Sequence, residues 1–147
     1  MPPLLLKKLA IVILVLAFIG FLDATYLTAK HYHDAIPPCG LVAGCETVLT
    51  SKYNNLFGVP VALFGSLYYL AIFFGAFTYL NNQGKTQILG SVAHASWLGF
   101  MMSLYFVSLQ LFVIKNICLY CMFSALISTT IFILGQIVLK KTKMWAV

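Results

Sequence analysis

Residues 118–139 read CLYCMFSALISTTIFILGQIVL, an apolar run without one charged side chain that ends at Lys140 and Lys141. A helix needs about 20 residues to cross the roughly 30 Å hydrocarbon core of a bilayer, so this run has the length of a membrane span. Lipid offers the backbone no hydrogen-bond partner, which favours a helix over irregular chain. The stretch therefore predicts a transmembrane helix that begins with two cysteines.

Three further long apolar runs precede it, over residues 4–29, 60–80 and 88–114. The 147-residue chain is 62% hydrophobic and 8% charged, whereas soluble domains carry about 25% charged residues. The first run is too long for the apolar part of a signal peptide, so we expect it to be retained. We predict an all-α integral membrane protein: a single domain over 1–147, built as a four-transmembrane-helix bundle with a long loop over 30–59.

The charged residues predict the orientation in the membrane. The net charge of +6 comes from nine lysines and no arginine, too thinly spread to form the clustered basic face that nucleic-acid binding requires. Lysines are enriched in cytoplasmic loops. Six of them share the side of the two termini and three lie on the other side, at Lys30, Lys52 and Lys115. We therefore expect both termini and the 81–87 loop in the cytoplasm, with the 30–59 loop outside.

All four cysteines fall at the predicted outer face. Cys39 and Cys45 lie in the 30–59 loop, and Cys118 and Cys121 begin the fourth run. Disulfides form and persist in the oxidising environment outside the cytoplasm. A disulfide between Cys39 and Cys45 closes so short a loop that it removes little chain entropy, and an exposed or strained disulfide is the kind that exchanges. A plain loop-stabilising bridge is the alternative.

The second pair has the spacing Cys118-Leu119-Tyr120-Cys121. Residues at i and i+3 share one face of a helix, so the two sulfurs can bond to each other. A cysteine at a helix N-terminus favours the thiolate, and Lys115 adds a nearby positive charge. Cys121 lies about one turn deeper toward the lipid. The pattern indicates a thiol–disulfide relay, although structural zinc sites also use this motif.

The segment 46–57 alternates apolar and polar residues with rough helical spacing. We expect a short amphipathic helix that lies in the membrane interface and covers the mouth of the bundle. A solvated loop is the alternative. Pro60, at the start of the second span, suits a position in the first turn of a helix.

This arrangement resembles the vitamin K epoxide reductase family. The resemblance covers nearly the whole chain. It rests on the loop pair Cys39/Cys45 and on Ser51, six residues beyond Cys45. It also rests on Phe64-Gly65 early in the second span and on the Cys118/Cys121 motif that begins the fourth span. Within the family the chain is similar to the bacterial-type homologues, here without a fused thioredoxin-like domain. The resemblance implies a thiol-disulfide:quinone oxidoreductase, and a separate thioredoxin-like extracytoplasmic protein as its partner.

The resemblance also implies roles for the cysteines. The partner thiol would attack Cys39 and free Cys45, Cys45 would attack Cys118, and the released Cys121 would reduce a membrane quinone. The quinone would be of the ubiquinone, menaquinone or vitamin K type. From the resemblance and from the depth of Cys121 we expect its site at Ser51, Phe64, Gly65, Tyr69, Phe106 and Ser124. Ordinary helix packing is the alternative role for each of these residues. No metal is expected.

Two positions depart from the vertebrate pattern of the family. Val61 and Ala125 stand where the vertebrate enzymes place Asn and Tyr. The change removes two head-group hydrogen bonds, so simple quinone reduction is favoured over vitamin K epoxide reduction. The lysines near the C-terminus lie too early for a dilysine retention signal, which favours a plasma (inner) membrane over the endoplasmic reticulum.

Three other interpretations remain open. His31 and His33 with Cys39 and Cys45 have the composition of a four-ligand zinc site. The cysteines are alternatively structural disulfides of a non-catalytic membrane protein. Asp23 is the only acid within a span and is therefore a candidate functional residue. The alternative is a pairing or capping role, because Lys30 lies two turns further on and shares its face.

Overall fold

The computed structural model describes residues 2–38, 44–82 and 85–145. Four long helices dominate: α1 (Pro2–Tyr32), α3 (Val61–Asn81), α4 (Thr86–Ser108) and α5 (Leu119–Trp145). A π-helix, η2 (Leu109–Ile114), continues α4. All four have the length and apolar composition to cross a membrane. The prediction of a four-helix membrane bundle is confirmed.

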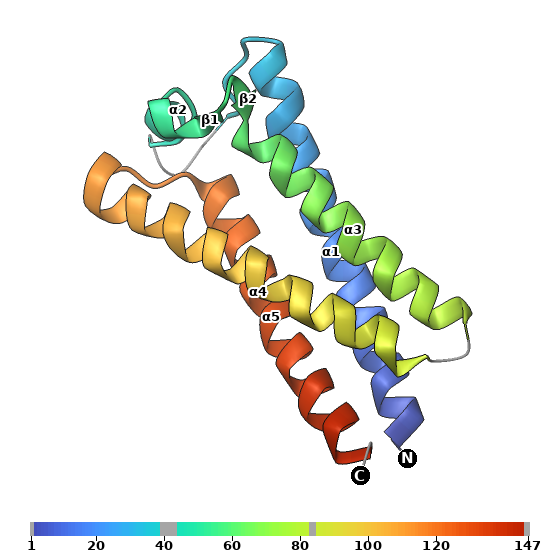
Figure 1. Ribbon diagram of the computed structural model, residues 1–147. Helices are drawn as coiled ribbons and strands as arrows, with labels where there is room; N and C mark the ends of the chain where they lie inside the picture. Colours follow the sequence, from blue (N-terminus) through green and yellow to red (C-terminus); the bar gives the residue numbers. More distant parts are fainter. Residues whose placement is uncertain (1, 39–43, 83–84, 146–147) are drawn as a thin grey trace.

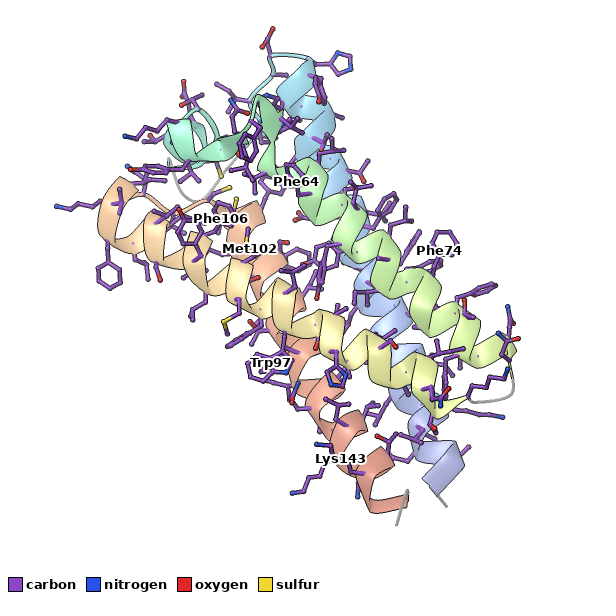
Figure 2. All side chains as sticks on the ribbon, viewed as in Figure 1. Phe64, Phe74, Trp97, Met102, Phe106 and Lys143 are labelled. Atoms are coloured by element: carbon purple, nitrogen blue, oxygen red, sulfur yellow. The ribbon has the colours of Figure 1, made fainter. Side chains whose placement is uncertain are left out.

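The helices are arranged as two pairs. α1 packs along α3, and α4 packs along α5. Figure 1 shows the start of α1, the end of α3, the start of α4 and the end of α5 at one end of the bundle, with the short elements α2, β1 and β2 at the other end. Small side chains let the helices approach closely in the core, where Ala10, Ala17 and Ala76 are fully buried. Large apolar side chains such as Phe74 and Trp97 are about half exposed on the outside (Figure 2), as lipid-facing residues are.

The first connection folds into a small cap, which we call the lid (residues 44–60). It contains α2 (Cys45–Leu49), a 3₁₀ turn η1 (Lys52–Asn54), and the strands β1 (Asn55–Leu56) and β2 (Val59–Pro60). The strands are antiparallel, with Asn55 opposite Pro60. Phe57 and Gly58 both have positive φ, 53° and 79°, which suits the tight two-residue turn of a β-hairpin.

The structure of the lid differs from the prediction of one amphipathic helix over 46–57, because the helix is shorter. The helix is real but ends at Leu49, because polar side chains bond its last carbonyls. The hydroxyl of Thr50 donates to the carbonyl of Glu46 (2.7 Å), and that of Ser51 donates to the carbonyl of Val48 (2.7 Å). Short polar side chains of this kind compete with the helical backbone bonds and favour turns.

The ends of the predicted spans also shift by a few residues. α1 continues past Ala29 to Tyr32, and α4 begins at Thr86, two residues before the predicted start. Pro60 was expected in the first turn of the second span, but it precedes that helix with extended backbone (φ −64°, ψ 137°) and belongs to β2. The prediction was wrong by one residue because the hairpin continues up to the start of α3.

Candidate active site

A buried cluster joins the lid to the start of α5. Its buried members are Cys45, Val48 and Cys118, of which Cys45 is 1% and Cys118 0% exposed. Cys45 is disulfide-bonded, whereas Cys118 and Cys121 are free thiols. Cys39 lies outside the described residues. The structure thus brings together one cysteine of each pair, which the sequence placed on the same face of the membrane without fixing any distance between them.

A glycine permits this approach. A Cβ atom on Gly44 would lie 2.6 Å from the carbonyl oxygen and 2.8 Å from the nitrogen of Ile117. These are backbone atoms and cannot move aside as a flexible side chain would. The absence of a side chain at Gly44 therefore lets the lid lie directly on the connection that precedes α5, and Cys45 shares a buried cluster with Cys118.

Two hydrogen bonds of the Cys118 backbone fix this residue immediately before α5. Its carbonyl accepts a bond from the N–H of Met122 (3.0 Å), so it stands immediately before the helix rather than within it. Its own N–H donates to the side-chain oxygen of Gln110 (2.9 Å). Gln110 belongs to η2 and is itself 2% exposed. A π-helical turn is rare and often marks a functional site; here it carries the side chain that fixes the position of Cys118.

The Cys118 thiol is acidified in this position. A hydrogen bond from the Cys121 thiol lowers the pKa of Cys118 from 9.0 to about 7, against the opposing effect of burial. The sequence indicated the same direction but attributed it to the helix terminus and Lys115. The larger cause is the second thiol of the motif, because the i, i+3 spacing places it one helical turn away.

A cavity of about 600 Å³ lies between the lid, α1, α3, α4, η2 and α5. Cys121 lines it, as do the residues that the family resemblance implies for a quinone site: Ser51, Phe64, Gly65, Tyr69, Phe106 and Ser124. Figure 2 shows Phe64 of α3 and Phe106 of α4 at the lid end of the bundle. Val61 and Ala125, the two positions that depart from the vertebrate pattern, also line the cavity. The described structure therefore gathers all these positions around one space.

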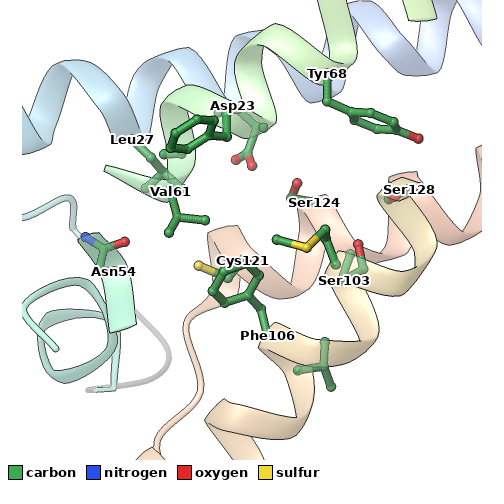
Figure 3. A pocket seen from close by; sticks show the side chains of 18 of the residues that line it. Asp23, Leu27, Asn54, Val61, Tyr68, Ser103, Phe106, Cys121, Ser124 and Ser128 are labelled. Carbon is green, nitrogen blue, oxygen red and sulfur yellow. The ribbon is translucent and has the colours of Figure 1, made fainter. Parts of the chain in front are cut away.

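The cavity is mostly apolar, with a few polar groups. The hydroxyl of Tyr69 donates to the backbone carbonyl of Ser124 (2.7 Å) and lies 2.9 Å from the Ser124 side-chain oxygen. Ser51 is less available than the sequence suggested, since its hydroxyl hydrogen goes to the carbonyl of Val48. Figure 3 shows Asp23, Cys121 and Ser124 around the same space.

Asp23 does not pair with Lys30. The ammonium group of Lys30 lies over the ring of Tyr26, 5.5 Å from its centroid. The Oδ2 atom of Asp23 is buried and has no hydrogen-bond partner among the described residues. The sequence interpretation of a structural ion pair is wrong, because Tyr26, a turn from each residue, offers the lysine an aromatic face instead.

Several polar residues of the site were not predicted. Gln110 and Asn54 are two of them, and both line the cavity. Gln110 is an uncharged polar residue inside an apolar span, which is a signal that the sequence did contain. Asn54 donates to the carbonyl of Leu49 (2.6 Å) and so fastens η1 to α2; its place depends on a lid fold that the sequence pattern did not predict.

The zinc interpretation conflicts with the state of Cys45. Cys45 is in a disulfide and so has no thiolate to offer a metal, whereas the Zn²⁺ ligand is the thiolate. Across residues 2–38, 44–82 and 85–145, no three His, Cys, Asp or Glu side chains gather in a metal-binding arrangement.

Comparison with known proteins bears on the identity of the fold and the site together. No curated protein matches the chain. The sequence model of the vitamin K epoxide reductase family matches residues 11–135, a range that includes all four cysteines and every cavity residue named above. The chain therefore belongs to the vitamin K epoxide reductase family, whose members are membrane oxidoreductases.

Proposed function

We propose that the protein is a thiol–quinone oxidoreductase that takes electrons from a reduced thioredoxin-like protein and passes them to a membrane quinone. The proposal rests on the positions of three cysteines relative to the cavity. Cys45 and Cys118 share one buried cluster, and Cys121 lines the cavity. Such a path brings electrons from the lid to a lipid-soluble acceptor.

The electron path consists of two exchanges and one oxidation. A dithiol partner attacks Cys39, becomes oxidised and leaves Cys39 and Cys45 as thiols. Cys45 then attacks Cys118 of a Cys118–Cys121 disulfide, and the Cys39–Cys45 disulfide forms again as Cys118 and Cys121 are released. The Cys118–Cys121 dithiol finally returns to a disulfide as two electrons and two protons pass to the quinone. The direction depends on the reduction potentials, since about 30 mV corresponds to 1.4 kcal/mol for this two-electron couple.

The cavity suits a quinone ring. Its volume of about 600 Å³ is within the range of small-molecule sites, and such sites are mainly apolar with a few placed polar groups. Phe64 and Phe106 offer aromatic faces, and Tyr69 and Ser124 offer hydroxyl groups. Val61 and Ala125 provide no hydrogen bond at the positions that vertebrate enzymes give to Asn and Tyr. This supports simple quinone reduction over epoxide reduction.

The proposal includes a location. The lid and the start of α5 lie at one end of the bundle, opposite the two ends of the chain (Figure 1). The lysine distribution favours an orientation with both termini in the cytoplasm and the lid outside, and we assign the protein to a plasma (inner) membrane. There the lid meets a thioredoxin-like partner in the oxidising compartment, and the reaction promotes disulfide formation in proteins of that compartment.

The test is quinone reduction by the purified protein in lipid, driven by a reduced thioredoxin-like protein and followed by loss of quinone absorbance. The assay compares ubiquinone and menaquinone, and includes each Cys→Ala variant. We expect turnover in the wild type and loss of partner-driven turnover in every cysteine variant. Absence of turnover with several quinones and partners, or full activity of Cys121→Ala, contradicts the proposal.

A further inference from the structure

Asp23 is a carboxyl group placed inside the apolar cavity. Of the three acids in the chain, Asp34 and Glu46 lie outside the spans and Asp23 lies within α1. Asp23 lines the cavity together with Cys121 and Ser124 of α5. In Figure 3 its carboxyl group points from α1 toward Ser124. An acid at this depth is costly and is usually retained for function.

The surroundings of Asp23 leave one of its oxygens available. Oδ2 is buried and has no partner in the part of the chain that the structure describes. Lys30, the nearest lysine along α1, lies on the ring of Tyr26 instead. Burial of a carboxyl oxygen without a hydrogen bond is unfavourable. A ligand atom in the cavity that shares a proton with Oδ2 removes this cost.

The proposed reaction requires proton transfer within this apolar space. Oxidation of the Cys118–Cys121 dithiol releases two protons, and reduction of a quinone to a hydroquinone takes up two. The titratable groups that line the cavity with Asp23 are Tyr53 of the lid, Tyr68 and Tyr69 of α3 and Cys121 of α5, and no lysine or histidine is among the described lining residues. Tyr69 already donates its hydroxyl hydrogen to Ser124. A carboxylic acid is also a far stronger acid than a phenol.

We propose that Asp23 is the proton donor to a quinone oxygen during the final step, an inference that rests on the proposed function. As the sulfur–sulfur bond between Cys118 and Cys121 forms, two electrons leave the thiols. One proton reaches the quinone from the Asp23 carboxyl group, and the second comes from a thiol. The remaining thiol proton restores the Asp23 acid, so that the two protons lost by the dithiol equal the two gained by the quinone.

Asp23 and the thiols are electrically coupled, as this role requires. The negative charge of Asp23 acts to raise the pKa of Cys118, against the larger effect of Cys121. Loss of the proton from Asp23 thus makes the thiol sulfur more basic, while protonation of Asp23 favours the thiolate. The acid and the thiols therefore influence each other's protonation across the cavity.

The test compares Asp23→Asn, which keeps the shape and removes the proton, with Asp23→Glu, which keeps the acid. Asp34→Asn is the matched control, since it removes an exposed acid just beyond α1 and away from the cavity. Quinone turnover is measured in water and in deuterium oxide. Transfer of electrons from the partner to Cys118 and Cys121 is measured separately, by alkylation of the thiols produced in a single turnover without quinone.

General acid catalysis contributes about 100-fold or more, so we expect Asp23→Asn to lower kcat for quinone reduction by about 100-fold and to change the solvent isotope effect. Thiol transfer in the same variant stays within about twofold of the wild type. Infrared difference spectra recorded on quinone reduction should contain a carboxyl C=O band that disappears in Asp23→Asn and persists in Asp34→Asn.

The outcomes separate this inference from the function on which it rests. An inactive wild type overturns the proposed function. An active wild type with unchanged kcat, isotope effect and infrared spectrum in Asp23→Asn overturns the role of Asp23 alone. If Asp23→Asn does not fold, Asp23→Glu decides: a retained carboxyl band with measurable turnover supports the inference, and turnover without any carboxyl band contradicts it.

Discussion

The side-chain oxygen of Gln110 accepts a hydrogen bond of 2.9 Å from the backbone N–H of Cys118, and both residues are almost fully buried. The bond crosses the connection between η2 and α5, and the N–H of Asn116 also donates to the backbone carbonyl of Gln110 (3.2 Å). A single glutamine thus secures the turn on which the second cysteine pair begins.

Replacement of Gln110 by Leu should destabilise this turn. The N–H of Cys118 would remain buried without its partner, which costs about 1–3 kcal/mol. Thermal unfolding in detergent measures the loss, with Gln87→Leu on the exposed face of α4 as the control. Equal stability of the two variants would show that the bond to Cys118 does not hold the turn.

Substitution of Gly44 by Ala should separate the two cysteine pairs. The added methyl group would overlap the backbone of Ile117, and overpacking of this kind costs about 1–3 kcal/mol. We expect slower reduction of the Cys118–Cys121 disulfide by the partner, measured by alkylation over time. Gly90→Ala is the control, because a Cβ there meets nothing within 4 Å. Unchanged exchange in Gly44→Ala would mean that the lid need not touch the 115–118 connection.

The ionisation of Cys118 should depend on Cys121. With a pKa of about 7, Cys118 is half ionised at neutral pH, and its thiolate fraction rises as the pH increases through that value. In Cys121→Ala the largest lowering hydrogen bond is lost, while burial and the hydrogen bonds from the backbone N–H groups of residues 120 and 121 remain, so the pKa of Cys118 should rise. Ultraviolet thiolate absorbance, recorded against pH with Cys39 and Cys45 replaced by Ala, measures both midpoints.

A serine at position 121 provides the matched comparison for that titration. The Cys121→Ser hydroxyl can still donate to the Cys118 thiolate, so its midpoint should remain below that of Cys121→Ala. Midpoints that both stay near the wild-type value of about 7 would assign the low pKa to the helix terminus or to Lys115 instead.

Loss of the hydrogen bond between Tyr69 and Ser124 should raise the KM for quinone and leave the rate of thiol exchange unchanged. Tyr69→Phe removes a hydrogen bond worth about 1 kcal/mol and frees Ser124 to reorient in the cavity. We expect the KM for quinone to rise severalfold, with thiol transfer unchanged. Tyr79→Phe, a buried tyrosine of α3 that does not line the cavity, is the control. An equal effect of both variants would indicate general loss of packing.

Most of the fold and part of the site could be predicted from local sequence patterns. The four spans are evident because lipid imposes a length and an apolar composition on every helix that crosses it. The acidity of Cys118 and the depth of Cys121 follow from helix geometry. The cavity residues came from the family resemblance rather than from the pattern, since any single aromatic in an apolar helix looks like a packing residue.

What the sequence did not predict depends on contacts between distant segments. The hairpin over 55–60 contains only two residues in each strand, too few for an alternating pattern. The approach of Gly44 to Ile117 joins residues 73 positions apart in the chain, and no local signal marks it. The sequence also did not predict that Asp23 and Lys30 form no ion pair. Helical spacing permits the pair, but the ammonium group of Lys30 lies over the ring of Tyr26 instead.

The central claim is that electrons pass from Cys45 to Cys118, and one measurement tests it most directly. In the double variant Cys39→Ala/Cys121→Ala, Cys45 and Cys118 are the only thiols that remain. The purified protein in lipid is oxidised and digested, and mass spectrometry identifies the disulfide. We predict an intramolecular Cys45–Cys118 disulfide in most molecules, formed at dilutions that prevent pairing between chains. Two thiols that stay free, or that pair only between molecules, would contradict the relay.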